Sequence, residues 1–391
     1  MINKIIFFIE SPLNQRDYNR FGFELLKKNG FELEVWDFSL ILYSKILKDI
    51  KIIEPIKNEK CYSFLTWKEA QSSILNLKPD CFIVCLISYQ FESYNLYKAL
   101  SKVKRPYCVF MANALPSIKI KRSVLYFNKL RKINLLKIIN LLFLQIPINY
   151  IGINPASIIL AGGVKSTNYN FPINKKTKTL WLHTLDYDIY LKDRNNLVQK
   201  DPNMGVFLDE YLPFHPDNIL LGLSIPSTAE EYYPTLCKFF DFIEKKYNVQ
   251  IVIAAHPRSN YSDNPDYFGG RPVFRGKTAE LVKRSGFIIT HSSTSINFAV
   301  LQHKPIIFVT SNRLNKNWKG LLIELMASQL GKKPINLDNP ISIDWKKELS
   351  INEEVYMNYQ ENYIKKTGSE ELPFWQIFAN HIKKKFILEH L

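Results

Sequence analysis

The sequence predicts an α/β protein made of two doubly wound domains. Short continuous apolar runs, typical of strands buried on both faces, alternate with segments of helical apolar spacing. This alternation occurs twice, before and after a Lys-, Asn- and Pro-rich stretch at 168–178 that we interpret as an interdomain linker. The length of 391 residues fits two domains, and a hydrophobic fraction of 46% provides two cores and excludes a disordered chain.

The first domain is predicted over 1–170. Apolar runs predict strands at 4–9, 32–36, 81–87 and 107–111. Helical spacing predicts helices at 18–29, 68–77 and 95–102, and Gly30 stops the first of them. Because helices join these strands, we expect a parallel sheet that is covered on both faces.

The segment 119–148 differs in composition from the rest of the first domain. It mixes Lys and Arg with Leu, Ile and Phe at helical spacing, and it contains no acidic residue. Two interpretations stay open. The segment is either a core helix with a solvated basic face or a helix that lies on an anionic membrane surface.

The second domain is predicted over 179–370. Apolar runs predict strands at 179–183, 204–208, 249–255, 286–290 and 305–309. A capping-box pattern at Ser227–Glu230 predicts a helix to about residue 246, and further helices are expected at 278–284 and 295–302. A C-terminal helix is predicted in 371–391. Two such domains facing each other place a cleft between the carboxyl edges of their sheets, where doubly wound folds bind ligands.

Charge and cysteine content restrict the partners and the compartment. The formal net charge of +16 favours anionic partners such as nucleotides, nucleic acid, glycans or lipid. The five cysteines form no CxxC pair, which favours a reducing, cytoplasmic location over a disulfide framework or a zinc site. Glu10 follows the first apolar run at once, so we interpret the N-terminus as a strand rather than a signal peptide. No apolar run is long enough to predict a transmembrane span.

Three polar elements of the second domain together predict a phosphate site. They are His256-Pro257-Arg258 after a strand, Gly276-Lys277-Thr278 before a helix, and Ser292-Ser293-Thr294 at a helix start. Backbone N–H groups and hydroxyls at a helix start bind phosphate, and a histidine can donate a hydrogen bond to it. Taken singly, each element is typical of a loop or a helix cap. The glycines before Lys277 have the wrong spacing for a Walker A loop.

The order of His256-Pro257 and Ser292-Ser293-Thr294 resembles the HP and S-S/T motifs of bacterial sialyltransferases and related Kdo transferases of the GT-B fold. The resemblance covers roughly residues 179–310. In that group the two motifs bind the CMP part of a CMP-sugar. A D/E-D/E-G motif supplies the general base, and here Asp209-Glu210-Tyr211 matches it with Tyr in place of Gly.

The resemblance implies an inverting transferase that needs no metal or cofactor. It would move a nonulosonate (sialic, legionaminic or pseudaminic acid) or Kdo from CMP to a bacterial surface glycan, with a free or lipid-linked acceptor. A carboxylate would deprotonate the acceptor hydroxyl, while His256, Ser292 and Ser293 stabilise the leaving phosphate. Arg258 or Lys277 would help to neutralise charge.

The residues offer further candidates for the base and the donor site. Glu10, after the first strand, and Asp17, at the entrance to the first helix, are rival carboxylates. Asp17 is equally consistent with a helix cap, and Glu10 with a solvated loop residue. His183 and Asp186 are predicted as secondary donor-site residues, and His215-Pro216 is interpreted as a turn.

Other functions fit the same sequence. One alternative is a GT-B transferase that uses a UDP-, GDP- or ADP-sugar, and a weaker one is a phosphotransferase of CDP-glycerol type. An alternative of another class is a basic protein that binds nucleic acid or a membrane without catalysis. The sequence carries no helix-turn-helix, zinc-finger or RNA-recognition signature, so we expect no nucleic-acid partner.

Overall fold

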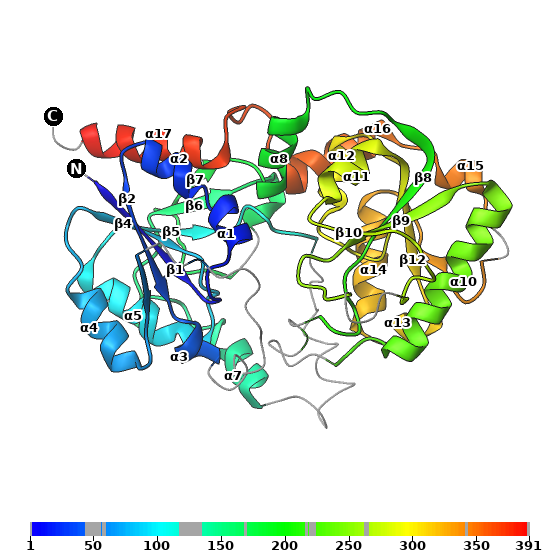
Figure 1. Cartoon of the computed structure of the whole chain (residues 1–391). Coiled ribbons are helices and arrows are strands. Elements are labelled where there is room, and N and C mark those ends of the chain that lie inside the picture. The colour runs from blue at the N-terminus through cyan, green and yellow to red at the C-terminus, as the bar shows by residue number, and fades with distance from the viewer. Residues whose placement is uncertain are drawn as a thin grey trace. The chain divides into compact units, whose positions relative to one another are not determined.

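The computed structural model describes residues 2–43, 56, 60–116, 135–167, 170–215, 218, 224–261, 266–340 and 343–388. The chain forms two compact units. The first consists of Met1–Ala114, Lys119–Leu185 and Lys365–Leu391, and the second of Leu115–Ile118 and Asp186–Ile364. Each unit contains its own parallel sheet with helices on both faces (Figure 1). This is the doubly wound architecture that the sequence predicts.

The first sheet has seven strands within the described residues, in the order β3-β2-β1-β4-β5-β6-β7. All neighbours pair in parallel. The strands are β1 (Lys4–Ile9), β2 (Glu32–Asp37), β3 (Cys61–Ser63), β4 (Cys81–Cys85), β5 (Tyr107–Phe110), β6 (Ile158–Ala161) and β7 (Lys178–Trp181). The four predicted strands are confirmed as β1, β2, β4 and β5.

Two groups of helices cover this sheet. The helices are α1 (Gln15–Arg20), α2 (Phe23–Lys28), α3 (Ser39–Tyr43), α4 (Trp67–Leu75), α5 (Tyr94–Val103), α7 (Leu135–Phe143) and α17 (Phe374–Leu388), with 3-10 turns at Phe91–Ser93 and Val164–Thr167. Helices α4, α5 and α7 contribute to the apolar core on one face, whereas α2 and α17 build the core on the other.

The predicted helix 18–29 is in fact two short helices. Gly22 separates α1 from α2 with a φ of +61°, a left-handed conformation that glycine adopts without strain. A Cβ at this position would come within 2.4 Å of the Trp375 ring of α17. The break therefore lets α17 approach the chain closely at this point.

The prediction that 179–183 opens the second domain is wrong. Strand β7 pairs with β6 in the first sheet, with Leu160 opposite Leu180. The stretch 168–178, interpreted above as an interdomain linker, therefore joins two strands of one sheet. The main stretch of the second unit begins at Asp186 and ends at Ile364, so α17 also belongs to the first unit.

The second sheet has six strands within the described residues, in the order β10-β9-β8-β11-β12-β13. They are β8 (Asp201–Leu208), β9 (Gln250–Ala255), β10 (Val273–Arg275), β11 (Ser285–Thr290), β12 (Ile306–Thr310) and β13 (Ile335–Asn336). The four predicted apolar strands 204–208, 249–255, 286–290 and 305–309 are confirmed as β8, β9, β11 and β12.

The helices of the second unit also lie in two groups. They are α8 (Leu185–Asp193), α10 (Ala229–Tyr247), α11 (Thr278–Arg284), α12 (Ile296–Leu301), α13 (Asn312–Asn315), α14 (Trp318–Gln329), α15 (Trp345–Glu348), α16 (Glu353–Tyr359) and a π-helix at Gln360–Ile364. Helices α11, α12 and α16 contribute to one core, and α10 builds the other. The helix predicted from Ser227–Glu230 is confirmed as α10, although the Thr228 side chain makes no capping bond.

Of the basic segment 119–148, the structure describes residues 135–148, which begin with helix α7. Residues 119–134 lie outside the described part of the chain. Phe143 is buried against Tyr89, but Leu141 and Leu142 of the same helix are exposed. None of the helices in the described residues combines the length and apolar character needed to cross a bilayer.

Candidate functional site

The strand orders place a topological switch point in each sheet. In the second sheet, the chain proceeds from β8 outward to β9 and β10 and then returns to β11 on the other side of β8. The switch point therefore lies between the carboxyl ends of β8 and β11. Doubly wound sheets bind ligands at such crevices. Asp209 and Glu210 directly follow β8, and His291 and Ser292 follow β11.

Asp209 holds the loop that carries His256. One carboxylate oxygen, Oδ2, accepts the His256 backbone N–H at 3.1 Å and the Tyr261 hydroxyl at 2.8 Å. The other oxygen, Oδ1, accepts the Tyr211 N–H at 2.9 Å. Burial raises the pKa of Asp209 to about 6, against the lowering effect of these hydrogen bonds. Because three donors occupy this buried carboxylate, its geometry favours positioning of a loop over proton abstraction from a substrate.

Tyr211 adopts a left-handed backbone conformation with a φ of +52°. Glycine adopts this conformation without strain, whereas a tyrosine does so only when its surroundings compensate the cost. The Tyr211 ring packs edge-on against Tyr261 at 5.4 Å. Tyr211, which stands where the D/E-D/E-G motif has glycine, thus adopts a backbone conformation that glycine favours.

His256 is oriented by its own loop. Its carbonyl accepts both the N–H and the hydroxyl of Ser259, at 2.9 and 2.7 Å. The ring Nδ1 lies 3.2 Å from the backbone N–H of Arg258, which donates to it. The neutral ring therefore carries its proton on Nε2, and Nε2 is the nitrogen that can donate to a phosphate.

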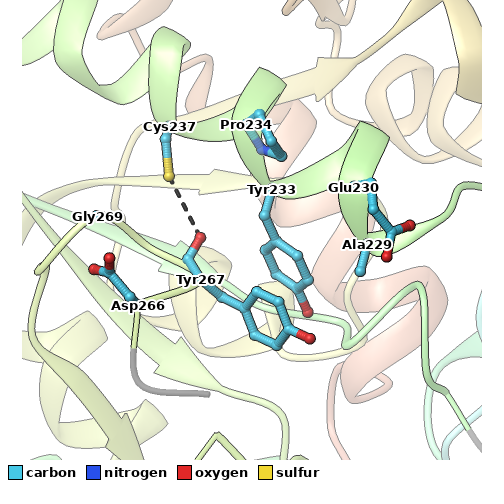
Figure 2. Close-up of a pocket in the computed structure, with 8 residues that line it drawn as sticks. All are labelled: Ala229, Glu230, Tyr233, Pro234, Cys237, Asp266, Tyr267 and Gly269. Carbon is cyan, nitrogen blue, oxygen red and sulfur yellow. Dashed lines mark hydrogen bonds between the residues drawn. The ribbon is translucent and has the colours of Figure 1, made fainter.

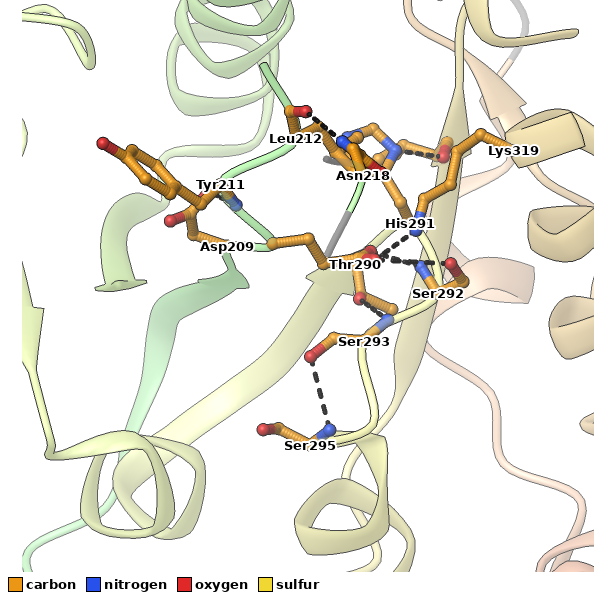
Figure 3. A network of polar contacts seen from close by, with 12 residues as sticks. Asp209, Tyr211, Leu212, Asn218, Thr290, His291, Ser292, Ser293, Ser295 and Lys319 are labelled. Atoms are coloured by element: carbon orange, nitrogen blue, oxygen red, sulfur yellow. Dashed lines mark hydrogen bonds and ion pairs between the residues drawn. The ribbon is translucent and has the colours of Figure 1, made fainter. Parts of the chain in front are cut away.

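Glu210 joins β8 to β11 through Ser292 and forms a buried ion pair with Lys319 of α14; Figure 3 shows where Ser292 and Lys319 lie. Its Oε1 accepts the Ser292 backbone N–H at 2.6 Å, and its Oε2 pairs with Lys319 Nζ of α14. Burial alone would raise the pKa of Glu210, but the Lys319 cation and the hydrogen bonds together hold it below its usual value. An ionised glutamate whose charge is offset by a buried lysine is a structural tie.

His291 supports the same junction as a neutral ring. Its Nδ1 donates to the Val309 carbonyl at 2.7 Å, and its Nε2 accepts the Tyr232 hydroxyl at 3.0 Å. Burial lowers the pKa of His291 to about 4, which keeps the ring uncharged at neutral pH. Lys319 and His291 are functional-site residues that sequence reasoning missed. No short motif signals Lys319, which lies 109 residues from its partner.

The Ser292–Thr294 loop follows β11 at the carboxyl edge of the second sheet. Ser292 is buried, Ser293 is half-buried and Thr294 is exposed. Ser293 donates its N–H to Thr290 Oγ1 at 3.3 Å, and its own hydroxyl accepts the Ser295 N–H at 3.3 Å. Helix α12 begins at Ile296, so these residues precede the helix instead of forming its first turn.

The Gly276–Thr278 element lies at the carboxyl end of β10, in the same sheet as His256. Gly276 has a φ of +77°, and no heavy atom lies within 4 Å of where its Cβ would be. Lys277 is exposed above the Phe274 ring, and Thr278 begins α11. The predicted elements after β9, β10 and β11 therefore all lie along the carboxyl edge of one sheet.

The structure places His183 in the first unit, which corrects the prediction that it ends the first strand of the second domain. His183 follows β7 in the first unit, because β7 pairs with β6. Its ring is buried, and its two nitrogens lie 2.9 Å from the carbonyls of Thr184 and Leu372. Asp186, in contrast, belongs to the second unit, where its carboxylate accepts Asn297 Nδ2 of α12 at 3.1 Å.

A second polar centre lies at the switch point of the first sheet, between β1 and β4. Glu10 Oε2 accepts the Ser88 backbone N–H at 3.0 Å, and Oε1 accepts the Ser88 hydroxyl at 2.9 Å. The Tyr43 hydroxyl lies 3.4 Å from Glu10 Oε2 and accepts Gln90 Nε2 at 3.3 Å. Glu10 is half-buried, whereas Glu210 is buried.

Asp17 lies within α1 and takes part in its capping. The Asp17 N–H donates to Asn14 Oδ1 at 2.9 Å, and the Asp17 carboxylate accepts Asn14 Nδ2 at 2.9 Å. Reciprocal bonds of this kind satisfy the first turn of a helix. The geometry therefore favours the capping interpretation of Asp17.

An aromatic-walled pocket of about 280 Å³ lies beside the His256 loop network (Figure 2). The first turns of α10 and the turn at 266–269 line it, and Tyr233 stacks on Tyr267 at 4.2 Å. The Tyr233 and Tyr261 hydroxyls lie 3.2 Å apart. Since Tyr261 donates to Asp209, Tyr233 is the donor of that pair. The pocket wall is thus linked by hydrogen bonds to the carboxylate that holds His256.

No protein-family model and no curated protein matches the chain. Among solved structures, the calicheamicin glycosyltransferase CalG4 matches with a TM-score of 0.51 and 10% identity, covering 98% of each chain. A co-structure of S. aureus MnaA with UDP matches with a TM-score of 0.50 and 13% identity, covering 99% of this chain and 98% of that one. The UDP-GlcNAc 2-epimerase from Methanocaldococcus jannaschii gives a TM-score of 0.48 at 13% identity and covers 97% and 99%. The first two show that the chain has the two-domain, Rossmann-like GT-B fold.

Proposed function

We propose that this protein is a glycosyltransferase that binds a nucleotide-sugar at the carboxyl edge of its second sheet. One observation carries the proposal. At the switch point, Asp209 fixes the His256 loop and Glu210 fixes the Ser292 loop, so two adjacent carboxylates position both predicted phosphate elements. The GT-B fold supports the proposal, because one of the solved structures that resemble this chain, CalG4, is a glycosyltransferase.

The donor that the comparisons favour is a UDP-sugar. MnaA was solved with UDP, and its TM-score reaches 0.50. A CMP-activated acidic sugar is the second candidate. It is favoured by the His256-Pro257 and Ser292–Thr294 motifs, which resemble those of sialyltransferases and Kdo transferases. Both donors have a pyrimidine base and a phosphate leaving group, and the same phosphate contacts serve either of them.

His256 and the Ser292–Ser293 loop would act on the leaving group. As the acceptor oxygen bonds to the anomeric carbon, the bond from that carbon to the phosphate oxygen breaks. The electron pair of this bond leaves with the phosphate. The Nε2 proton of His256 and the hydroxyls of the Ser292–Ser293 loop would stabilise the developing charge. Arg258 and Lys277 follow neighbouring strands and would add positive charge.

Glu10 is the carboxylate that we propose as the general base. It would take the proton of the acceptor hydroxyl as that oxygen attacks the sugar. Ser88 fixes its orientation through two hydrogen bonds. We assign Asp209 and Glu210 as positioning residues, because buried partners occupy their carboxylates.

Nucleotide titration tests the donor site. Melting temperature is measured with UMP, UDP, CMP, CDP, GDP and ADP, because a ligand that binds the native state raises it. A selective shift with UDP supports a UDP-sugar, and a selective shift with CMP supports the acidic-sugar donor. His256→Ala should abolish the shift. His303→Asn is the matched control, since His303 is an exposed histidine of the same unit that pairs with Glu353. No shift with any nucleotide would contradict the proposal.

We also propose that the first unit binds an anionic membrane surface through the end of its basic segment. Leu142 is 59% exposed, and Ile146 and Tyr150 after it are exposed as well. Leu142 and Ile146 lie within the segment 119–148, and Tyr150 follows it closely. This segment has no acidic residue. Exposed apolar side chains next to a segment rich in Lys and Arg are typical of helices that lie on an anionic lipid surface.

Vesicle sedimentation with anionic and zwitterionic lipid tests the membrane proposal. Leu142→Ser should reduce binding to anionic vesicles, and salt should reduce it further. Leu321→Ser is a matched control, because Leu321 in the second unit is also 59% exposed. Equal sedimentation of wild type and Leu142→Ser would contradict membrane binding through this surface.

A further inference from the structure

Two histidines meet at the carboxyl edge of the second sheet. The rings of His215 and His256 lie with their centroids 4.7 Å apart at an interplanar angle of 54°. His215 lies in the loop that follows β8, and His256 follows β9, the neighbouring strand. Each of them precedes a proline in the sequence. The interpretation of His215-Pro216 as a plain turn leaves this contact unexplained.

The loop before His215 is fixed by aromatic packing. Phe214 packs against Tyr211 at 5.2 Å and against Tyr267, part of the pocket wall, at 5.9 Å. The left-handed backbone of Tyr211 turns the chain there, and the Phe214 N–H donates to the Tyr211 carbonyl at 2.9 Å. A side chain on so constrained a loop is preorganised, which reduces the entropy lost when it contacts a ligand.

The partner histidine is fixed as well. Asp209 holds the His256 backbone, and the Arg258 N–H at Nδ1 sets its ring tautomer. Both rings therefore occupy defined positions on the edge where the phosphate of the donor would lie. Charged groups near this pair include Asp209, whose carboxylate is turned to backbone and tyrosine donors, and Arg258 in the same loop as His256.

We infer that His215 is a second phosphate-binding residue that donates a hydrogen bond to the nucleotide beside His256. This inference rests on the proposed function, which places a nucleotide phosphate at this edge. Two imidazoles in ring contact can reach different oxygens of one phosphate group or of adjacent phosphates, since each hydrogen bond spans about 3 Å.

The test compares a nucleotide with its nucleoside. Affinities for UDP and uridine, and for CMP and cytidine, are measured by calorimetry and ligand-observed NMR. His215→Ala should weaken nucleotide binding about tenfold, the effect of one charge-assisted hydrogen bond, and should leave nucleoside binding within about twofold. His215→Phe keeps a ring against His256 but has no N–H donor, so it should lose as much nucleotide affinity as the alanine variant.

Each outcome has a defined meaning. Equal losses for nucleotide and nucleoside, or full affinity in His215→Phe, would overturn the inference, because His215 would then support the loop only. Weak nucleotide binding in His256→Ala combined with normal binding in His215→Ala would overturn the inference and leave the proposed function intact. Absence of nucleotide binding by the wild type would overturn both. His303→Asn serves again as the control and should bind both ligands as the wild type does.

Discussion

The two sheets carry the same polar arrangement at the same topological position. In the first sheet, Glu10 after β1 accepts the N–H and hydroxyl of Ser88, which follows β4. In the second sheet, Glu210 after β8 accepts the N–H of Ser292 at 2.6 Å, with the Ser292 hydroxyl at 3.4 Å, and Ser292 follows β11. In both sheets the glutamate and the serine flank the switch point.

The third partner differs between the two centres. Glu210 is buried and pairs with Lys319, whereas half-buried Glu10 has the neutral Tyr43 hydroxyl beside it. The ion pair with Lys319 holds the Glu210 carboxylate inside the core of its unit, whereas the Glu10 carboxylate lies partly open to solvent. Topology thus places both carboxylates at a switch point, and burial distinguishes them: the buried Glu210 joins elements of its unit, while the half-buried Glu10 is partly open to solvent.

Replacing the two glutamates should have the most divergent effects. Glu10→Gln should lower kcat by about 10²- to 10⁴-fold, the usual contribution of a general base, with a change in melting temperature of about 3 °C or less. Glu210→Gln should instead lower the melting temperature, because it leaves Lys319 buried without a counter-ion. Transfer rates and melting curves of both variants check this. Asp17→Asn is the control on the first unit and should keep its activity, since Asp17 caps α1.

Removal of the buried cation should destabilise only the second centre. Lys319→Met leaves Glu210 charged and buried, which costs about 3–5 kcal/mol of the free energy of unfolding. The double variant Glu210→Gln with Lys319→Met should recover much of that loss. Urea unfolding measures both. If Lys319→Met were as stable as the wild type, the Glu210–Lys319 ion pair would not stabilise the second unit. The proposed difference between the two glutamates would then be wrong.

The cost of Lys319→Met should depend on pH. In the wild type the pKa of Glu210 is held below its usual value, so the stability from its ionised form is complete near neutral pH and is lost as pH falls. Without Lys319, burial raises the pKa of Glu210, and its ionised form becomes destabilising. The difference in unfolding free energy between wild type and variant should therefore shrink from about pH 7 to about pH 5. A constant difference would argue against the ionised pair.

Replacing Ser88 and Ser292 by alanine should have the smallest effects of these variants. The two effects should differ in size. The Ser88 hydroxyl lies 2.9 Å from Glu10, whereas the Ser292 hydroxyl lies 3.4 Å from Glu210. Ser88→Ala should cost about 1 kcal/mol of transition-state stabilisation, seen as about a fivefold lower kcat. Ser292→Ala should change the melting temperature only slightly.

The buried strands could be predicted from the sequence because their signal is local. Lys4–Ile9 and Ile306–Thr310 are continuous apolar runs, and the structure confirms them as strands. The short edge strands Cys61–Ser63 and Ile335–Asn336 carry no such signal, because few of their side chains are buried. Ile158–Ala161 is apolar and detectable, and its omission led to the wrong assignment of 179–183.

The site could be predicted in part for the same reason. His256 and Ser292 follow apolar strands, so their place at a sheet edge follows from the pattern. Lys319 could not be predicted, since a lysine in a helix is exposed by default and only tertiary packing buries it against Glu210. The contact of His215 with His256 likewise depends on a left-handed tyrosine that no sequence rule anticipates.

The return of the chain to the first unit after Ile364 has a consequence for synthesis on the ribosome. The second unit occupies one nearly continuous stretch, whereas the first needs α17, whose Phe374, Trp375 and Phe378 complete a core with Phe7 and Phe82. The strands β1 and β4 are therefore made before the second unit but lack one wall of their core until α17 emerges. The nascent first unit must wait, with that apolar face uncovered, while the whole second unit is translated and can fold.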